Sequence, residues 1–180
     1  MAAAGGSKGA GSLRCIIHID MDSFYAEVER VRLGLPADRP LVVQQWESLI
    51  AVNYPARRHG IARSRGKGII DPVEAKEACP DLVAVHVPLF TLEGMIDLDI
   101  NESITSQARA RRPMGKACLD RYREAGYKVI QIFKRFTPAV ERASIDEAFI
   151  DITDLVEARA AAAAAARGPE WWRSESFAGS

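Results

Sequence analysis

Cysteine, net charge and long apolar runs are all scarce in this sequence of 180 residues. The three cysteines, Cys15, Cys79 and Cys118, are widely spaced and form no Cys-x-x-Cys pair. This pattern argues against a disulfide framework or a cysteine zinc site, and it favours a reduced intracellular protein. No apolar run approaches the length of a membrane span, so we expect no membrane partner.

Net charge is absent because Lys+Arg and Asp+Glu are balanced at 24 each. Overall charge therefore does not predict a nucleic-acid partner, and only local basic patches could do so. A hydrophobic fraction of 48% with 27% charged residues is ordinary for a globular chain that forms one well-packed domain. Residues 1–12 contain no apolar signal core and predict a disordered tail.

Two acidic residues stand at the end of a predicted strand, residues 13–21, in the stretch IIHIDMDSFYAEVE. Because side chains alternate along a strand, Asp20 and Asp22 share the face opposite Ile17 and Ile19. Charges on a strand that otherwise reads as buried need a chemical reason.

A helix is predicted directly after this strand, over residues 23–33. Asp22 or Ser23 is placed to cap its first turn, and Gly34 marks its end. Three apolar residues at helical spacing are expected to form its buried stripe: Phe24, Val28 and Val31. Tyr25 lies off that stripe.

A second acidic pair, Asp146 and Glu147, lies between two β-rich runs in AVERASIDEAFIDIT, which predicts a hairpin with the acids at its tip. Together with Asp20, the pair could bring three carboxylates together. Their repulsion and desolvation would be relieved by a divalent cation, and carboxylate oxygens suit magnesium. The alternative remains open that Asp22 only caps a helix and that the acidic pair is a solvated turn.

Several motifs occur together in one order: IDMDSFYAEVE, LIAVNYPARRHGIARS, GKACLDRYREAG and ERASIDEAFIDIT. In this combination the chain resembles the Y-family (UmuC/DinB-type) translesion DNA polymerases, and within them the eukaryotic eta branch. The resemblance covers most of residues 14–154 in blocks. It implies an α+β fold in which part of a ferredoxin-like palm is joined to a small fingers subdomain.

The resemblance also divides the chain. Residues 13–154 are expected to be the palm and fingers portion, with the fingers at about 40–88. Residues 89–113 match nothing in the family and are expected to be an insertion, and residues 155–180 form an unmatched C-terminal tail. We therefore expect an N-terminal fragment of a longer polymerase.

The metal site implied by the resemblance uses Asp20, Asp146 and Glu147 as catalytic ligands, with the backbone carbonyl of Met21 as a further ligand. The family holds two Mg²⁺ ions there, for which Mn²⁺ can substitute. They serve phosphoryl transfer, in which a primer 3′-hydroxyl attacks the α-phosphate of a nucleotide.

The nucleotide site implied by the resemblance places Tyr25 as the steric gate against a 2′-hydroxyl, with Phe24 lining the pocket unless it is plain core. The resemblance also implies that Tyr54 and Arg57 bind the triphosphate and that Arg63 lies over the incoming base. It implies that Gln44 contacts the template and that Arg142 and Ser144 contact DNA.

The expected function is that of a nuclear DNA-directed DNA polymerase that adds deoxynucleotides opposite damaged bases. Its partners are expected to be primer–template DNA, dNTP and, through regions outside the matched blocks, a sliding clamp. Two alternatives remain. One is a phosphatase of the haloacid dehalogenase type with Asp20 as nucleophile and Asp22 as acid. The other is a non-catalytic fragment that binds nucleotide or DNA.

Overall fold

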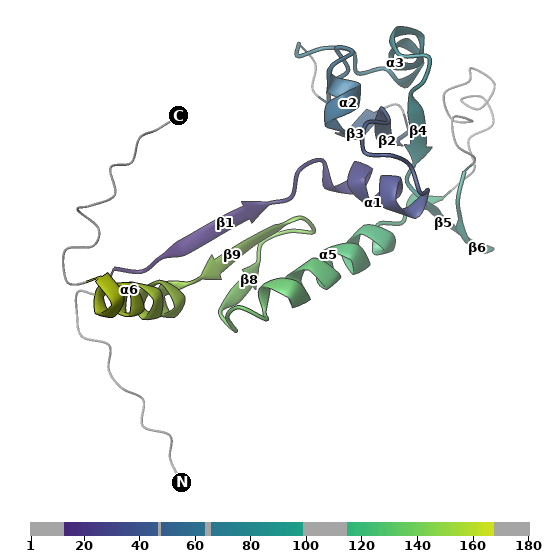
Figure 1. Cartoon of the computed structure of the whole chain (residues 1–180). Helices are drawn as coiled ribbons and strands as arrows, with labels where there is room; N and C mark the ends of the chain where they lie inside the picture. Colours follow the sequence, from purple (N-terminus) through teal and green to yellow (C-terminus); the bar gives the residue numbers. More distant parts are fainter. Residues whose placement is uncertain (1–12, 47, 64–65, 99–114, 168–180) are drawn as a thin grey trace. The chain divides into compact units, whose positions relative to one another are not determined.

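The protein is described by a computed structural model over residues 13–46, 48–63, 66–98 and 115–167 (Figure 1). Its internal contacts divide the chain into two units, which are described separately. The first unit joins Met1–Asp20 to Val129–Ser180, and the second consists of Met21–Lys128. The predicted tail at residues 1–12 lies outside the described residues.

The first unit contains an antiparallel sheet in the order β1-β9-β8. Its strands are β1 (Ile16–Asp20), β9 (Glu147–Asp151) and β8 (Val140–Arg142). One face buries Ala148 and Ile150. On the other face the ring of His18 stacks on the ring of its cross-strand neighbour Phe149, with centroids 4.6 Å apart. The hairpin predicted around Asp146 and Glu147 is thus confirmed.

A polar clasp ties the start of β1 to the start of α6 (Thr153–Arg167), the helix that follows β9. Two guanidinium nitrogens of Arg14 donate to Oδ2 of Asp151, at 2.9 and 3.2 Å. Oδ1 of Asp151 accepts from the backbone N–H and the hydroxyl of Thr153. The Thr153 hydroxyl in turn accepts from the N–H of Cys15 at 3.0 Å. The Asp151 carboxylate and the Thr153 hydroxyl therefore connect the residues before β1 with the start of α6.

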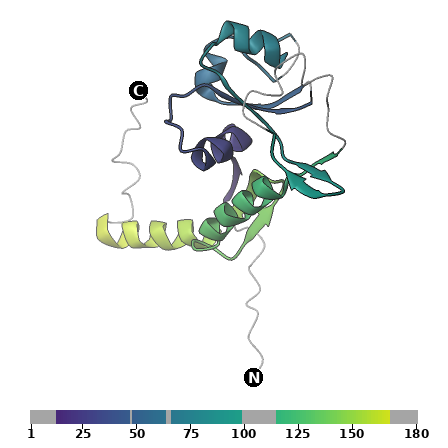
Figure 2. The same cartoon turned by 90° about the vertical axis from the view of Figure 1, so that its right-hand side faces the viewer.

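The second unit is built around a sheet in the order β3-β2-β4 (Figure 2). β2 (Leu41–Gln45) pairs antiparallel with β3 (Ser48–Val52) and parallel with β4 (Val83–His86). β2 and β4 are buried along most of their length, as expected for strands covered on both faces. Three helices accompany this sheet: α1 (Phe24–Arg32), α2 (Tyr54–Arg57) and α3 (Pro72–Ala78).

The main core of this unit is made of small and branched apolar side chains. Its buried members are Val42, Leu49, Val52, Ala56, Ile61, Ala75, Cys79, Leu82 and Ala84. α3 begins at a side-chain cap, because the Asp71 carboxylate accepts from the N–H groups of Val73 and Glu74 and Pro72 occupies the first turn.

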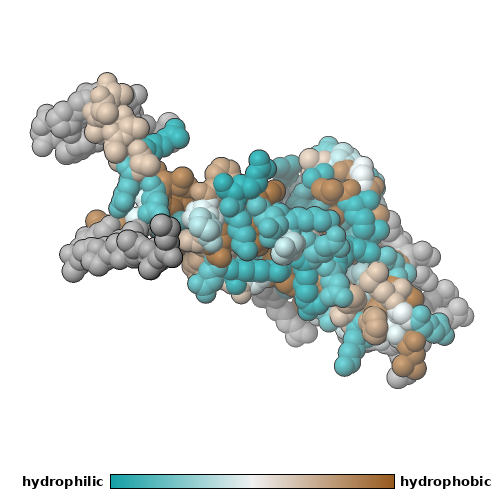
Figure 3. Space-filling view, turned by 90° about the horizontal axis from the view of Figure 1, so that it is seen from below, coloured by the Kyte–Doolittle hydropathy of each residue, from teal (hydrophilic) through white to brown (hydrophobic). Residues whose placement is uncertain are grey.

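A third, small sheet in the order β6-β5-β7 joins β5 (Leu89–Thr91), β6 (Gly94–Ile96) and β7 (Lys116–Ala117). The predicted insertion of residues 89–113 therefore opens with a hairpin, and its remainder from residue 99 lies outside the described residues. Phe90 and Met95 face each other across this hairpin and are 60% and 55% exposed. Figure 3 shows apolar residues, in brown, among hydrophilic residues, in teal, on the face seen from below.

The buried face of α1 differs from the predicted stripe. Val31 is 69% exposed, whereas Glu29 has no exposed surface. The carboxylate of Glu29 accepts from the guanidinium groups of Arg32 and Arg121 and from the hydroxyl of Tyr122. A charged residue can replace an aliphatic one here because each carboxylate oxygen has a donor. The two partners from beyond α1 belong to α5 (Asp120–Phe133), a helix of 14 residues.

Candidate active site

Two of the three predicted catalytic carboxylates lie directly opposite each other. Asp20 is the last residue of β1, Glu147 is the first residue of β9, and the two are cross-strand partners. Partners in an antiparallel pair point to the same face, with their Cβ atoms about 4.5–5.5 Å apart. Asp20 is exposed and Glu147 is half-buried. The sheet of the first unit therefore ends in a pair of neighbouring acids that solvent can reach.

The third carboxylate, Asp146, lies in the turn before β9, and its position is fixed by Ser144. The Ser144 hydroxyl donates to Oδ1 of Asp146 at 2.8 Å and accepts from the Asp146 N–H at 3.2 Å. Arg142 closes the same turn, because its Nε donates to the Ser144 carbonyl at 2.7 Å. Both residues predicted to contact DNA thus serve the acidic turn in this structure.

The donor set at this end of the sheet consists only of carboxylate oxygens. Oxygen ligands suit Mg²⁺ or Mn²⁺ and disfavour softer metals. Within the part of the chain that the structure describes, however, no group of three or more His, Cys, Asp or Glu residues lies close enough to hold an ion. The chemistry of these oxygens fits a hard divalent cation, and Asp20 and Glu147 are the two carboxylates that the sheet places side by side. Met21, the predicted backbone ligand, is the first residue of the second unit.

In the second unit, Tyr54 and Arg57 form a stacked pair on α2. The guanidinium carbon of Arg57 lies 4.7 Å from the centre of the Tyr54 ring, and both side chains are exposed. α2 starts at a firm anchor, because the buried Asn53 side chain accepts from the N–H groups of Ala56 and Leu41. The pair predicted to grip a triphosphate is therefore brought together on a fixed short helix.

Polar contacts hold this pair against the start of α1. Arg57 donates through Nε to the Val52 carbonyl and through Nη2 to the Ser23 hydroxyl, both at 2.9 Å. The Tyr54 hydroxyl donates to Oδ1 of Asp22 at 3.0 Å. That hydrogen bond and the charge of Asp22 raise the pKa of Tyr54, so the phenol stays protonated and remains a donor.

The predicted capping role of Asp22 is wrong. The residue before α1 is Ser23, which has left-handed backbone angles (φ 48°, ψ 37°) and makes no side-chain cap. Its hydroxyl donates instead to the carbonyl of Val52 at 2.9 Å. Asp22 instead accepts the hydrogen bond of the Tyr54 hydroxyl, because the left-handed conformation of Ser23 departs from the usual capping geometry.

Tyr25, the predicted steric gate, stacks on Tyr122. Their ring centroids are 4.1 Å apart and the planes differ by 7°. Tyr122 is fully buried and its hydroxyl donates to Oε1 of Glu29 at 2.9 Å. Burial, followed by the charge of Glu29 and this hydrogen bond, raises the pKa of Tyr122 far above its usual value. Phe24 is 8% exposed and meets Tyr25 edge to face at 6.4 Å, so it is mainly a core residue.

Arg63 and Gln44 have contrasting positions. Arg63 is exposed, in a loop closed by the bridge between Ile61 and Ile69. Gln44 is 1% exposed, and its Nε2 donates to the carbonyl of Trp46 at 3.2 Å. Its Oε1 is buried and has no hydrogen-bond partner among the residues that the structure describes. Arg63 is thus free to meet a ligand, whereas Gln44 is enclosed.

With this geometry established, comparison with known proteins decides the family. The model of the impB/mucB/samB family matches residues 19–168. The chain belongs to this family. The resemblance to Y-family DNA polymerases is thereby confirmed. As a separate finding, no helix among the described residues is both long and apolar enough to cross a membrane.

Relatives of this impB/mucB/samB chain include DNA polymerase eta of Saccharomyces cerevisiae, which is 40% identical over 147 residues. That match covers 78% of this chain and 22% of the relative. The N-acetyltransferase eso1 of Schizosaccharomyces pombe is 43% identical over 81% of this chain and 15% of its own length. DNA polymerase iota of Mus musculus is 36% identical over 82% of this chain and 16% of its own. The chain thus spans 15–22% of the length of these relatives, and none of them is named a phosphatase.

Sequence reasoning missed two residues beside the candidate site, Glu29 and Tyr122. The signal was present for Glu29, since it lies four positions after Tyr25 and therefore on the same side of one helix. The partner Tyr122 comes from a distant helix, which no local pattern identifies.

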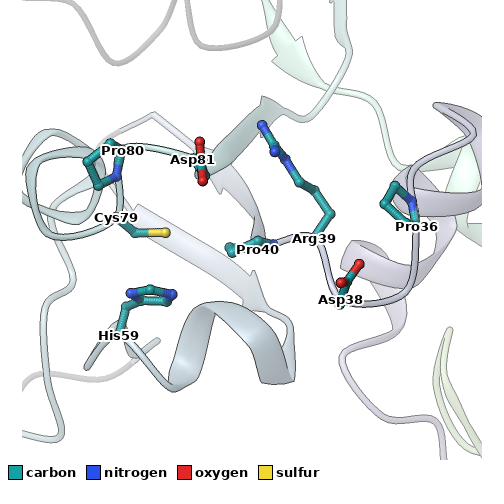
Figure 4. Close-up of a pocket in the computed structure, with 8 residues that line it drawn as sticks. All are labelled: Pro36, Asp38, Arg39, Pro40, His59, Cys79, Pro80 and Asp81. Atoms are coloured by element: carbon teal, nitrogen blue, oxygen red, sulfur yellow. The ribbon is translucent and has the colours of Figure 1, made fainter.

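A separate cavity of about 400 Å³ also lies in the second unit (Figure 4). It is lined by Pro36, Asp38, Arg39, Pro40, His59, Cys79, Pro80 and Asp81. None of the predicted site residues lines it. The candidate site residues therefore lie outside this cavity.

Proposed function

We propose that this chain carries the acidic centre and the nucleotide-binding residues of a translesion DNA polymerase. The observation that carries the proposal is the cross-strand pairing of Asp20 with Glu147 at the exposed end of the β1–β9 sheet. Such a pair is expected where oxygen ligands must reach a shared cation. Relatives named DNA polymerase eta and DNA polymerase iota support the choice of reaction.

In the first unit, Asp20, Asp146 and Glu147 would hold two Mg²⁺ ions, or Mn²⁺ in their place. When bound, such ions lower the pKa of an attacking 3′-hydroxyl and neutralise charge on the phosphates. Ser144 orients the Asp146 carboxylate through its hydroxyl, and Arg142 holds the turn closed. The main-chain carbonyl of Met21 would complete the ligand set.

In the second unit, Tyr54 and Arg57 bind the triphosphate, because a phenol and a planar guanidinium both donate to phosphate oxygens. Tyr25, backed by the ring of Tyr122, excludes the 2′-hydroxyl of a ribonucleotide. Arg63 lies over the incoming base. Gln44 contacts the template only if its amide becomes accessible, since it is enclosed here.

At the level of architecture, we propose that the β1-β9-β8 sheet belongs to a ferredoxin-like palm and that the second unit includes the fingers. The substrates are primer–template DNA and dNTP, the working place is the nucleus, and a sliding clamp is a further partner through other regions of a longer protein. Translesion synthesis opposite damaged bases is the corresponding role.

Mn²⁺ binding tests the acidic centre directly. We expect the 180-residue chain to bind Mn²⁺, detected as loss of the free-ion electron paramagnetic resonance signal, and Asp20→Asn to weaken that binding about tenfold or more. Glu141→Gln is the matched control, since Glu141 is an exposed carboxylate on β8 of the same sheet. Equal affinities for all three proteins would refute the metal site.

Primer extension tests the reaction. A chimera in which residues 19–168 replace the matching segment of the Saccharomyces cerevisiae polymerase eta supplies the additional length of a family member. We expect this chimera to extend a primer and Asp146→Ala to abolish extension. Extension that persists in Asp146→Ala would remove this residue from the reaction.

A further inference from the structure

The hydroxyl of Tyr54 is already bound to an anionic oxygen within the protein. It donates to Oδ1 of Asp22 at 3.0 Å. A tyrosine hydroxyl carries one hydrogen and so donates to one acceptor at a time. Any phosphate oxygen that takes this hydrogen bond must therefore displace the Asp22 carboxylate.

The neighbouring arginine does not share this conflict. Arg57 uses Nε on the Val52 carbonyl and Nη2 on the Ser23 hydroxyl, and both acceptors are neutral. A guanidinium has five N–H donors, so these two bonds leave donors for an incoming anion. Arg57 can thus bind phosphate while it stays stacked on Tyr54.

The surroundings favour the exchange of one anion for another at this point. Asp22 and Tyr54 are both exposed, so the carboxylate can return to water when the hydroxyl leaves it. The segment before α1 has no side-chain cap, and a helix N-terminus attracts negative charge. Negative charge before α1, from Asp22 or from a phosphate, is therefore favoured.

We propose that Asp22 competes with the nucleotide triphosphate for the hydroxyl of Tyr54. The Asp22 carboxylate accepts the hydrogen bond of this hydroxyl until a phosphate oxygen replaces it. This inference rests on the proposed function of Tyr54 and Arg57 as triphosphate ligands. Asp22 thereby keeps the phenol oriented beside Arg57 in the free protein, and it lowers the apparent affinity for nucleotide. Nucleotide binding becomes an exchange of one acceptor for another instead of a simple addition.

A double-mutant cycle on the full 180-residue chain tests this exchange. The dissociation constants of dATP and of inorganic tripolyphosphate, each with Mg²⁺, are measured by calorimetry for wild type, Asp22→Ala, Tyr54→Phe and the double variant. We expect Asp22→Ala to tighten binding on the order of threefold to tenfold, since an exposed charged hydrogen bond is weak. In the Tyr54→Phe background the same substitution should change nothing, because no phenolic hydrogen is left to compete for.

Matched controls separate the contact from general effects. Asp38→Ala removes another exposed carboxylate of the same unit, and Tyr127→Phe removes another exposed phenol. Both should leave the affinities unchanged. Asp22→Asn keeps an acceptor without the charge and should fall between wild type and Asp22→Ala.

Three results would overturn the inference and leave the proposed function standing. Weaker binding in Asp22→Ala would make Asp22 a support for the site. A gain that persists in Tyr54→Phe would reveal simple repulsion of the triphosphate. An unchanged affinity in Asp22→Ala would leave the contact without effect. Failure of the wild-type chain to bind either probe would refute the proposed function itself, and with it this inference.

Discussion

Glu29 is a charged residue with no exposed surface, and three donors surround its carboxylate. Arg32 and Arg121 form ion pairs with it, and Tyr122 donates a hydrogen bond. Removing Glu29 takes the acceptor from the buried Tyr122 hydroxyl and one of two ion pairs from Arg121, which keeps its pair with Asp97 at 2.8 Å. Breaking a buried group in this way costs more than the attraction itself. The residue therefore links α1 to α5 and supports the ring on which Tyr25 stacks.

We expect Glu29→Ala to lower the free energy of unfolding by roughly 3–5 kcal/mol. Urea denaturation of the full chain measures this change. Glu124→Ala is the control, because Glu124 pairs with Lys128 on the surface of α5 and such pairs contribute about 0.3–0.5 kcal/mol. Similar losses for both variants would contradict the structural importance of the buried group.

The choice between ribose and deoxyribose provides a second prediction at the residue scale. In the chimera with the yeast polymerase, Tyr25→Ala should raise the relative use of rNTP on the order of tenfold or more, because a polar group is then no longer excluded by the ring. Steady-state ratios of kcat/KM for dATP and ATP measure this. Tyr127→Ala serves as control, and an unchanged ratio in Tyr25→Ala would rule out the gate.

At the scale of elements, the strands and helices were largely predictable because their signals are local. Two β-rich runs around Asp146 and Glu147 predicted the hairpin that β8 and β9 form. The buried face of α1 was not predictable in the same way. Its choice of Glu29 over Val31 depends on partners that come from α5, nearly a hundred residues later in the chain.

The candidate site shows the same division. The pairing of Asp20 with Glu147 follows from strand and hairpin positions, so sequence reasoning could anticipate it. The partner of Asp22 could not be anticipated, because the left-handed conformation of Ser23 decides where that carboxylate points. Backbone angles of single non-glycine residues leave little trace in a sequence.

The loop that carries Arg63 depends on one glycine. Gly68 has φ +152°, and a Cβ at this position would lie 2.2 Å from the carbonyl oxygen of Gly60. That carbonyl accepts the N–H of Ile69, which closes the loop. We expect Gly68→Ala to break this closure and to cost about 1–3 kcal/mol, measured by thermal unfolding. Gly34→Ala is the comparison, since its φ is also positive but its Cβ would meet nothing within 4 Å.

The clasp at α6 predicts a dependence of stability on pH. Hydrogen bonds from the Thr153 hydroxyl and N–H, and then from Arg14, hold the pKa of Asp151 well below its usual range. The unfolded chain binds that proton more readily, at a pKa of about 3.9. The stabilisation is therefore complete above that value and is lost as the pH falls through the lowered pKa.

Thermal unfolding of wild type and Asp151→Asn measures this effect. The difference in Tm should be constant at neutral pH and should shrink once the pH falls below about 4. A difference that persists unchanged in strong acid would show that the charge of Asp151 contributes nothing.

At the scale of the whole molecule, the balance of charge limits binding to DNA. The net charge of the chain is +0, and affinity for DNA grows with the number of phosphates that a protein neutralises. Positioning is equally demanding, because a misplacement of about 1 Å can reduce a rate about a hundredfold. The relatives also devote most of their length to residues outside the match.

We therefore expect residues 1–180 alone to bind primed DNA with a dissociation constant above about 10⁻⁶ M, and more weakly as salt rises from about 50 to 200 mM. Fluorescence anisotropy measures the binding. Primer extension by this chain should be slight. Robust extension that Asp146→Ala abolishes would prove the 180 residues sufficient.

The polar contacts between the start of β1 and the start of α6 include a cysteine that can be labelled. Cys79 and Cys118 are buried, whereas Cys15 is partly exposed beside Thr153. Thiol reagents react through an accessible thiolate, so they should modify Cys15 first. A fluorophore attached there would need no engineered cysteine. It would report, in one unmutated chain, when the start of α6 detaches from β1 during acid titration or unfolding.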